Sequence, residues 1–307
     1  MKYNINRRDF IQAVTGLTGV GMIGLSLNKK KNEPLLSFST LGSPDWPFNK
    51  IVEFARTNNY HGIELRGLQR QLDLTKCPEF SSADNIRATK KVVEQNGLKI
   101  INLGSSSYLH LPAGAEREKH LDDAKRFIDL ARQLNCPYVR VFPNNLPKNE
   151  DKQVVLERIA AGLTELGNYS KGSNVMVLME THGEVVQSAD IKKIMEISQP
   201  AGVGLIWDIF NMWSVTKEPP REAYSVLKPY IRHTHIKDAK IFDGKTQYTL
   251  LGQGESPIFE AINLLASDDY KGYYSFEWEK LWHPEIAEPE IAFAAYSKTM
   301  QEYFRKR

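Results

Sequence analysis

The chain has 307 residues, of which 41% are hydrophobic, 25% charged and 10% aromatic. This composition excludes a disordered chain, a fibrous repeat and a multi-span membrane protein. The net charge of +3 is uneven, because residues 1–33 hold six Lys or Arg and two acidic residues, leaving 34 basic against 35 acidic residues beyond them. A body at −1 lacks the basic surface that nucleic-acid binding needs, so we expect no nucleic-acid partner.

Residues 1–33 have the pattern of a targeting leader. Arg7 and Arg8 are followed by Phe10 and Ile11, then by an apolar, glycine-rich stretch to residue 27 and three lysines. The arrangement resembles a twin-arginine export signal, which implies a periplasmic protein. The apolar stretch is short and glycine-rich for a membrane span, and no clear cleavage site precedes the lysines, so removal of the leader and its retention as an anchor both stay open. The alternative is a cytoplasmic protein with an amphipathic N-terminal helix.

Residues 34–307 alternate between short apolar runs and longer amphipathic runs. The predicted strands are residues 35–41, 62–66, 99–103, 138–142, 175–179, 203–207, 231–236 and 273–278. The predicted helices are residues 49–58, 83–95, 116–134, 153–169, 188–198, 221–227, 257–266 and 289–304. Eight strands that alternate with helices predict a parallel sheet with helical crossovers, and the length fits one (β/α)₈ TIM barrel. An open doubly wound sheet is disfavoured, because no Gly-x-Gly-x-x-Gly turn follows the first strand.

The two cysteines, Cys77 and Cys136, are too few for a disulfide scaffold. Cys136 precedes an apolar run, where a free cysteine behaves as a small buried hydrophobe. A bridge between the two stays open at this point.

Chemically active side chains gather at the ends of the last four predicted barrel strands. Glu180, Asp208, His235 and Glu277 follow or end these strands, and the carboxyl ends of barrel strands meet at one rim. Three carboxylates and one imidazole suit Mn²⁺, Mg²⁺, Co²⁺ or Zn²⁺. Because three crowded carboxylates repel one another, the sequence predicts one divalent cation here.

These residues lie in motifs that resemble a known superfamily over roughly residues 35–305. The motifs are Met-Glu-Thr-His around Glu180, Trp-Asp-Ile-Phe-Asn around Asp208 and His-Thr-His-Ile-Lys-Asp around His235, with Glu277 closing the series. They are similar to those of the xylose isomerase-like sugar phosphate isomerase/epimerase superfamily. The resemblance implies that all four residues hold the metal, and that Glu180 and Glu277 also act as the acid/base pair.

The remaining site candidates are assigned to substrate binding. They are Glu64, Arg66, His182, Asn211, Lys237 and Trp282. Asn211 replaces a histidine of the epimerase branch and cannot carry a proton; His182 either supplies that imidazole or holds Glu180 in place.

Several of these residues have structural alternatives. Glu64 and Arg66 share a strand face and either form an ion pair or bind sugar hydroxyls. His233 is expected in the barrel core, one layer below the metal ligands. Glu279 and Lys280 are expected to form an ion pair at the rim.

The leading hypothesis is a metal-dependent sugar isomerase or epimerase that acts on a non-phosphorylated keto-sugar or glycoside through an enediolate. Export and the lack of a glycine-rich phosphate loop favour a free carbohydrate substrate. The alternatives are β-elimination from a 3-keto-glycoside at the same site, a non-catalytic sugar-binding barrel, and DNA repair of the endonuclease IV type, which needs more histidines. The sequence leaves the substrate, the metal and the oligomeric state open.

Overall fold

The computed structural model describes residues 33–307, so the predicted leader, with Arg7, Arg8, Phe10 and Ile11, lies outside the described residues. Residues Pro34–Arg307 form one compact unit. None of the helices within 33–307 is both long and apolar enough to cross a membrane.

Eight parallel strands close into a barrel in the order β1-β10-β7-β6-β5-β4-β3-β2. The barrel strands are β1 (Leu35–Ser39), β2 (Gly62–Leu65), β3 (Lys99–Tyr108), β4 (Tyr138–Phe142), β5 (Met176–Glu180), β6 (Gly204–Asp208), β7 (Ile231–Ile236) and β10 (Tyr273–Phe276). The (β/α)₈ prediction is confirmed. β5 and β6 end one residue later than predicted, so that Glu180 and Asp208 are the last residues of their strands.

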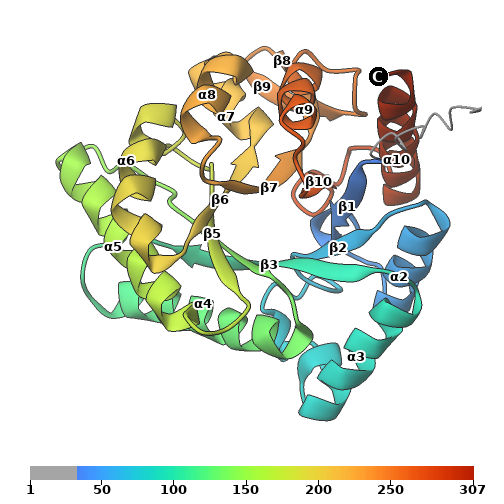
Figure 1. Ribbon diagram of the computed structural model, residues 1–307, viewed down its shortest axis with the longest axis horizontal. Coiled ribbons are helices and arrows are strands. Elements are labelled where there is room, and N and C mark those ends of the chain that lie inside the picture. Colours follow the sequence, from blue (N-terminus) through green and yellow to red (C-terminus); the bar gives the residue numbers. More distant parts are fainter. Residues whose placement is uncertain (1–32) are drawn as a thin grey trace, which may run out of the picture. The chain divides into compact units, whose positions relative to one another are not determined.

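Helices surround this barrel (Figure 1). They are α2 (Phe48–Thr57), α3 (Ala83–Gln95), α4 (Ala115–Leu134), α5 (Lys152–Ser170), α6 (Ser188–Ser198), α7 (Ile209–Thr216), α8 (Pro220–Leu227), α9 (Ile258–Ser267) and α10 (Pro289–Lys306). In the part of the chain that the structure describes, four 3₁₀ turns lie in the connections, at Thr40–Gly42, Leu74–Lys76, Pro78–Phe80 and Gln199–Ala201. The helices bury apolar side chains such as Ile128, Ile159 and Phe293 against the strands.

One helix and one two-stranded hairpin were not predicted. α7 begins directly after Asp208, whose Oδ1 accepts a hydrogen bond from the Asn211 amide at 2.8 Å and so caps the helix. Between β7 and α9, the strands β8 (Asp238–Phe242) and β9 (Lys245–Thr249) form an antiparallel hairpin. Its two-residue turn, Asp243-Gly244, has positive φ at both positions, as a type I′ turn requires.

The barrel interior is polar as well as packed. Side chains from Ser37, Glu64, Asn102, His233 and Ser275 are fully buried there. Cys77 and Cys136 are both buried free thiols, as expected for Cys136. The disulfide bond between them that the sequence left open does not form.

Candidate active site

Four predicted ligands converge at the carboxyl-terminal end of the barrel. His235 lies in β7 at the level of Asp208 in β6, and Glu277 directly follows β10. His235 Nδ1 is 3.1 Å from Glu180 Oε1, 3.3 Å from Glu277 Oε1 and 4.0 Å from Asp208 Oδ2. One donor atom from each residue lies within 4.8 Å of all the others, and all four side chains are buried.

A buried arginine that the sequence analysis missed contacts the cluster. Arg140, in the middle of β4, donates from Nη1 to Glu180 Oε2 at 2.9 Å and from Nη2 to the Ser105 carbonyl at 3.0 Å. The same Nη1 lies 3.6 Å from Glu277 Oε1. The alternation of side chains along β4 could have indicated this position, because it places Arg140 on the same strand face as Phe142 at the end of the strand. The guanidinium carbon lies 4.0 Å from the centre of the Phe142 ring.

Lys237 supplies a second buried cation. Its Nζ lies 2.7 Å from Asp208 Oδ2, 2.6 Å from Glu277 Oε2 and 2.8 Å from Glu279 Oε1. Glu279 therefore pairs with Lys237, while Lys280 pairs with Glu288 at 2.9 Å. The expected ion pair between Glu279 and Lys280 is wrong, because burial of Lys237 beside Glu279 provides the stronger partner.

The charge balance of this cluster fits a divalent cation. When ionised, its four carboxylates, Glu279 included, carry four negative charges, and Arg140 and Lys237 carry two positive ones. Among these groups, and with His235 neutral as a metal-binding imidazole must be, the remaining two negative charges equal the charge of one divalent cation. A metal is therefore not the sole relief of this repulsion, contrary to the sequence prediction, because the two buried cations offset half of the negative charge. Oxygen-rich donors with one imidazole suit such an ion.

Burial and neighbouring charges shift the pKa values of these groups. Burial raises the pKa of Asp208 to about 7. Burial also raises the pKa of Glu180, but His235 and Arg140 outweigh it and hold that pKa below its usual range. For His235, burial opposes the charged form, yet the carboxylates of Glu277 and Glu64 outweigh it and hold the pKa well above that of a free imidazole.

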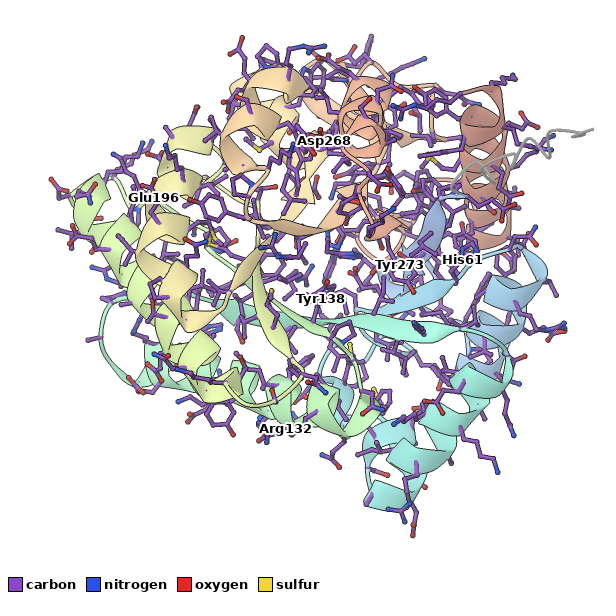
Figure 2. The ribbon with its side chains drawn as sticks, in the orientation of Figure 1. His61, Arg132, Tyr138, Glu196, Asp268 and Tyr273 are labelled. Atoms are coloured by element: carbon purple, nitrogen blue, oxygen red, sulfur yellow. The ribbon has the colours of Figure 1, made fainter. Side chains whose placement is uncertain are left out.

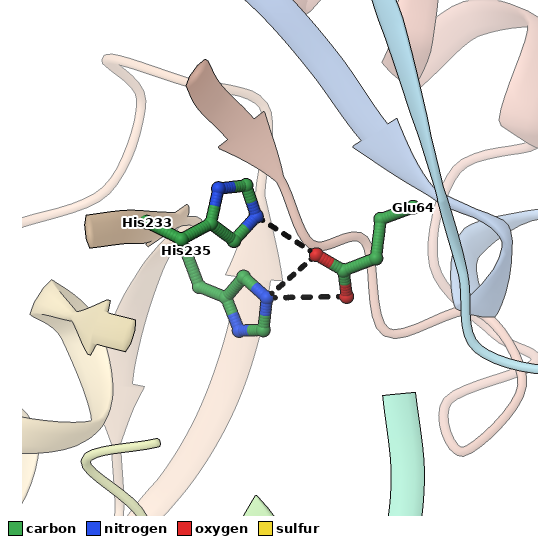
Figure 3. A group of neighbouring side chains, drawn as sticks. All are labelled: Glu64, His233 and His235. Carbon is green, nitrogen blue, oxygen red and sulfur yellow. Dashed lines mark hydrogen bonds and ion pairs between the residues drawn. The ribbon is translucent and has the colours of Figure 1, made fainter. Parts of the chain in front are cut away.

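Glu64 contacts Nε2 of His235 (Figure 3), whereas Glu180 contacts the other ring nitrogen, Nδ1. Its Oε2 is 3.0 Å from Nε2 of His233 and 3.0 Å from Nε2 of His235, and its Oε1 is 3.1 Å from the latter. The side chain is fully buried and does not line the site pocket. The expected ion pair with Arg66 is therefore wrong, while contact between Glu64 and a substrate stays a prediction. His233 is a core residue, as expected.

A cavity of about 170 Å³ lies over the cluster. It is lined by Leu41, Arg66, Arg140, Phe142, Glu180, His182, Asn211, Lys237, Tyr248, Glu277, Glu279 and Trp282. The predicted Arg66, His182, Asn211, Lys237 and Trp282 all reach it. Tyr248 belongs to the unpredicted hairpin, so only recognition of the Asp-Gly turn could have suggested that this segment returns to the rim. At about 30 Å³ per liquid water, the cavity has the size of one small ring.

His182 is held by Asn144 instead of holding Glu180. Its Nδ1 lies 3.1 Å from Asn144 Oδ1, and its ring packs 4.3 Å from that of Phe142. Burial lowers the pKa of His182, so the imidazole is neutral at physiological pH. This neutral ring offers the pocket a hydrogen-bonding group next to the carboxylates.

Two larger hollows, of about 640 and 860 Å³, lie away from the cluster. Tyr138 and Tyr273, labelled in Figure 2, line the first and are the opening residues of β4 and β10. This end of a barrel maintains the fold in known enzymes, whereas chemistry occurs at the opposite end. The chemical character of the smaller cavity therefore identifies the candidate site.

Comparison with known proteins gives the same assignment of fold. Residues 52–296 match the family described as Xylose isomerase-like TIM barrel. The chain is 25% identical over 277 residues to fructoselysine 3-epimerase from Shigella flexneri, covering 87% of this chain and 95% of that one. It is 23% identical over 226 residues to 3-dehydroshikimate dehydratase from Bacillus anthracis, covering 70% and 78%. The crystal structure of the IOLI protein with a bound zinc atom superposes with a TM-score of 0.72 at 17% identity, covering 88% and 98%.

Metal binding to this cluster should strengthen as the pH rises. Below about pH 7 the metal-free chain holds protons on Asp208 and His235, and a metal must displace them. For each proton that the metal displaces, we expect the affinity of the full-length protein for Mn²⁺ to fall about tenfold with every unit by which the pH is lowered. Calorimetric titrations at pH 6, 7 and 8, in buffers of different ionisation enthalpy, measure both quantities. An affinity independent of pH, with no proton release, would contradict the assignment.

Proposed function

Since the chain belongs to the xylose isomerase-like TIM barrel family, we propose that it is a metal-dependent sugar isomerase or epimerase acting on a non-phosphorylated keto-sugar or glycoside. The observation that carries the proposal is the placement of Glu180 and Glu277. Both carboxylates lie within 3.3 Å of His235 Nδ1, and both line the cavity. A ring bound between them exposes one carbon to two carboxylates, which is what removal and return of a proton require.

Glu180, Asp208, His235 and Glu277 would hold the divalent cation. Bound there, the cation would supply electrophilic polarisation of a carbonyl and the adjacent hydroxyl. His235 directs Nδ1 toward the cluster because its Nε2 is bound to Glu64. We propose that Glu64 keeps the proton of His235 on Nε2 and leaves Nδ1 free as a ligand.

The carboxylates carry the proton transfers in this proposal. The pKa of Glu180 is held below its usual range by His235 and Arg140 against the effect of burial, so Glu180 is ionised and accepts the proton from carbon. Glu277 is also ionised and accepts the proton of the substrate hydroxyl as the substrate binds. Glu277 then delivers its proton to the other face of the carbon, and Glu180 returns its proton to the oxygen. The proton count closes, and both carboxylates are regenerated.

Elimination is the second candidate at the same site. Proton removal by Glu180 would be followed by loss of a β-substituent. The observation that favours it is Glu279, which lines the cavity and whose pKa is raised by burial. A carboxyl group at this position lies where it can pass a proton to a departing hydroxyl or alkoxide. The 3-dehydroshikimate dehydratase among the relatives is named for such a loss of water.

We also propose that the protein reaches the periplasm folded, on the strength of Arg7, Arg8, Phe10 and Ile11. Replacing both arginines by lysine should leave the protein in the cytoplasm, because the twin-arginine pair is the recognised element. Fractionation of cells that express either form measures the distribution. Equal export of the double variant would exclude this route.

Glu180→Gln and Glu277→Gln should each lower turnover by at least about 10²-fold, because each removes one proton carrier. The assay is incubation in D₂O of the Mn²⁺-loaded, full-length protein with free ketoses and 3-keto-glucosides, followed by mass spectrometry. Deuterium gain with an intact skeleton marks epimerisation or isomerisation, and loss of water or aglycone marks elimination. Glu165→Gln, on the outer face of α5, is the matched control.

Normal turnover by either variant would overturn the acid/base assignment. Tight sugar binding without exchange in the wild-type protein would identify a binding barrel.

Glu64→Gln should weaken Mn²⁺ binding about 10- to 100-fold, because an uncharged amide is a poorer acceptor for the Nε2–H groups of His233 and His235. Calorimetry measures the loss, and ¹⁵N NMR of the metal-free protein reports whether the His235 proton leaves Nε2. Thermal unfolding of the same variant shows whether the fold persists. An unchanged affinity and tautomer would contradict the proposed role of Glu64.

A further inference from the structure

Arg66 is a buried cation in the site pocket that lacks a negatively charged partner. It follows β2, is 6% exposed and lines the cavity over the cluster. Its backbone N–H donates to Thr40 Oγ1 at 2.9 Å, and its Nη2 donates to Ser106 Oγ at 3.0 Å. Nη1 is buried and has no hydrogen-bond partner among the described residues. A guanidinium nitrogen left this way costs free energy unless a ligand supplies the acceptor.

Arg66 forms no direct ion pair, although the more distant carboxylates of Glu277 and Glu180 favour its charged form. Within residues 33–307, no carboxylate lies within 4.0 Å of its guanidinium. The two pocket carboxylates whose charges act on Arg66 are Glu180 and Glu277. Both already form ion pairs with other residues, namely His235, Arg140 and Lys237. Burial and the like charge of Arg140 lower the pKa of Arg66 to about 9, which still leaves it protonated at neutral pH.

The two arginines are packed side by side above a glycine. A Cβ on Gly104 would lie 2.7 Å from Arg66 Cδ and 3.2 Å from Arg140 Nη2. Any larger residue at position 104 would force one of these side chains to shift, so glycine gives both of them room over β3. Arg140 is neutralised by Glu180, whereas Arg66 has no equivalent. The chain thus accommodates a second buried guanidinium that acts on the metal cluster only at a distance and forms no ion pair with it.

We propose that Arg66 binds a carboxylate group of the substrate, so that the enzyme acts on acidic keto-sugars of the uronate type. This inference rests on the proposed function and narrows its substrate class. A carboxylate matches the planar donor geometry of a guanidinium and adds one negative charge against the one positive charge of Arg66. A phosphate dianion calls for more donors, and such sites usually add backbone N–H groups from a loop or helix end.

Binding of matched ligands tests the carboxylate site directly. The Mn²⁺-loaded, full-length protein is titrated with D-glucuronate, D-glucose and glucose 6-phosphate by calorimetry. We expect glucuronate to bind at least about tenfold more tightly than glucose, as a charged hydrogen-bonded pair provides. Arg66→Gln should abolish the preference for glucuronate over glucose. Arg66→Lys should keep only part of this preference, because lysine retains the positive charge but lacks the planar, paired N–H donors of a guanidinium. Arg132→Gln, on the outer face of α4, should bind like the wild type.

Equal binding of glucose and glucuronate, or an unchanged preference in Arg66→Gln, would overturn the inference, as would tighter binding of glucose 6-phosphate. Unchanged Mn²⁺ affinity of Arg66→Gln establishes that its site is folded. Incorporation of deuterium from D₂O into keto-sugars distinguishes failure of this inference from failure of the proposed function. Equal exchange of neutral and acidic keto-sugars defeats only the substrate class. A glucuronate preference that depends on Arg66, with no exchange in any keto-sugar, supports the carboxylate site while defeating the proposed reaction.

Discussion

Concentrated negative charge inside a protein is the constraint on which this active-site region depends. Glu180, Asp208, Glu277 and Glu279 are all buried at one end of the barrel, where water screens them little. Arg140 and Lys237 offset part of that charge. Burial raises the pKa values of Asp208 and Glu279, and the neighbouring carboxylates add to this effect, whereas His235 and Arg140 hold the pKa of Glu180 below its usual range.

The fold and the convergence of Glu180, Asp208, His235 and Glu277 could be predicted because both depend on local rules. Strand-helix alternation is visible in the periodicity of apolar residues, and parallel barrel strands end at a common rim whatever their sequence. Glu180 and Asp208 therefore had only one place to go once their strands were identified. His235 could be distinguished from His233 by depth alone, since the two share a strand face two residues apart.

Partners across the barrel could not be predicted in the same way. Strand alternation says that Glu64 and Arg66 face the same side, but not which distant residue each one meets. Glu64 contacts two histidines 169 and 171 residues away, and Arg66 contacts Ser106. Arg140 was overlooked because a single arginine within an apolar strand carries no motif. α7 depends on a cap by Asp208, a residue that the sequence analysis assigned wholly to the metal.

The β8–β9 hairpin has a consequence for how this protein could diversify. Its strands pair with each other and lie outside the closed barrel sheet, yet Tyr248 from β9 forms part of the cavity wall. The segment is a side branch of the chain, anchored at its base by Asp238, which accepts hydrogen bonds from the amides of Gly252 and Gly254. Insertions or exchanges beyond that anchor would reshape the mouth of the cavity without altering the register of any barrel strand. One part of the cavity wall is thus encoded in a stretch of the polypeptide that is separate from the barrel strands.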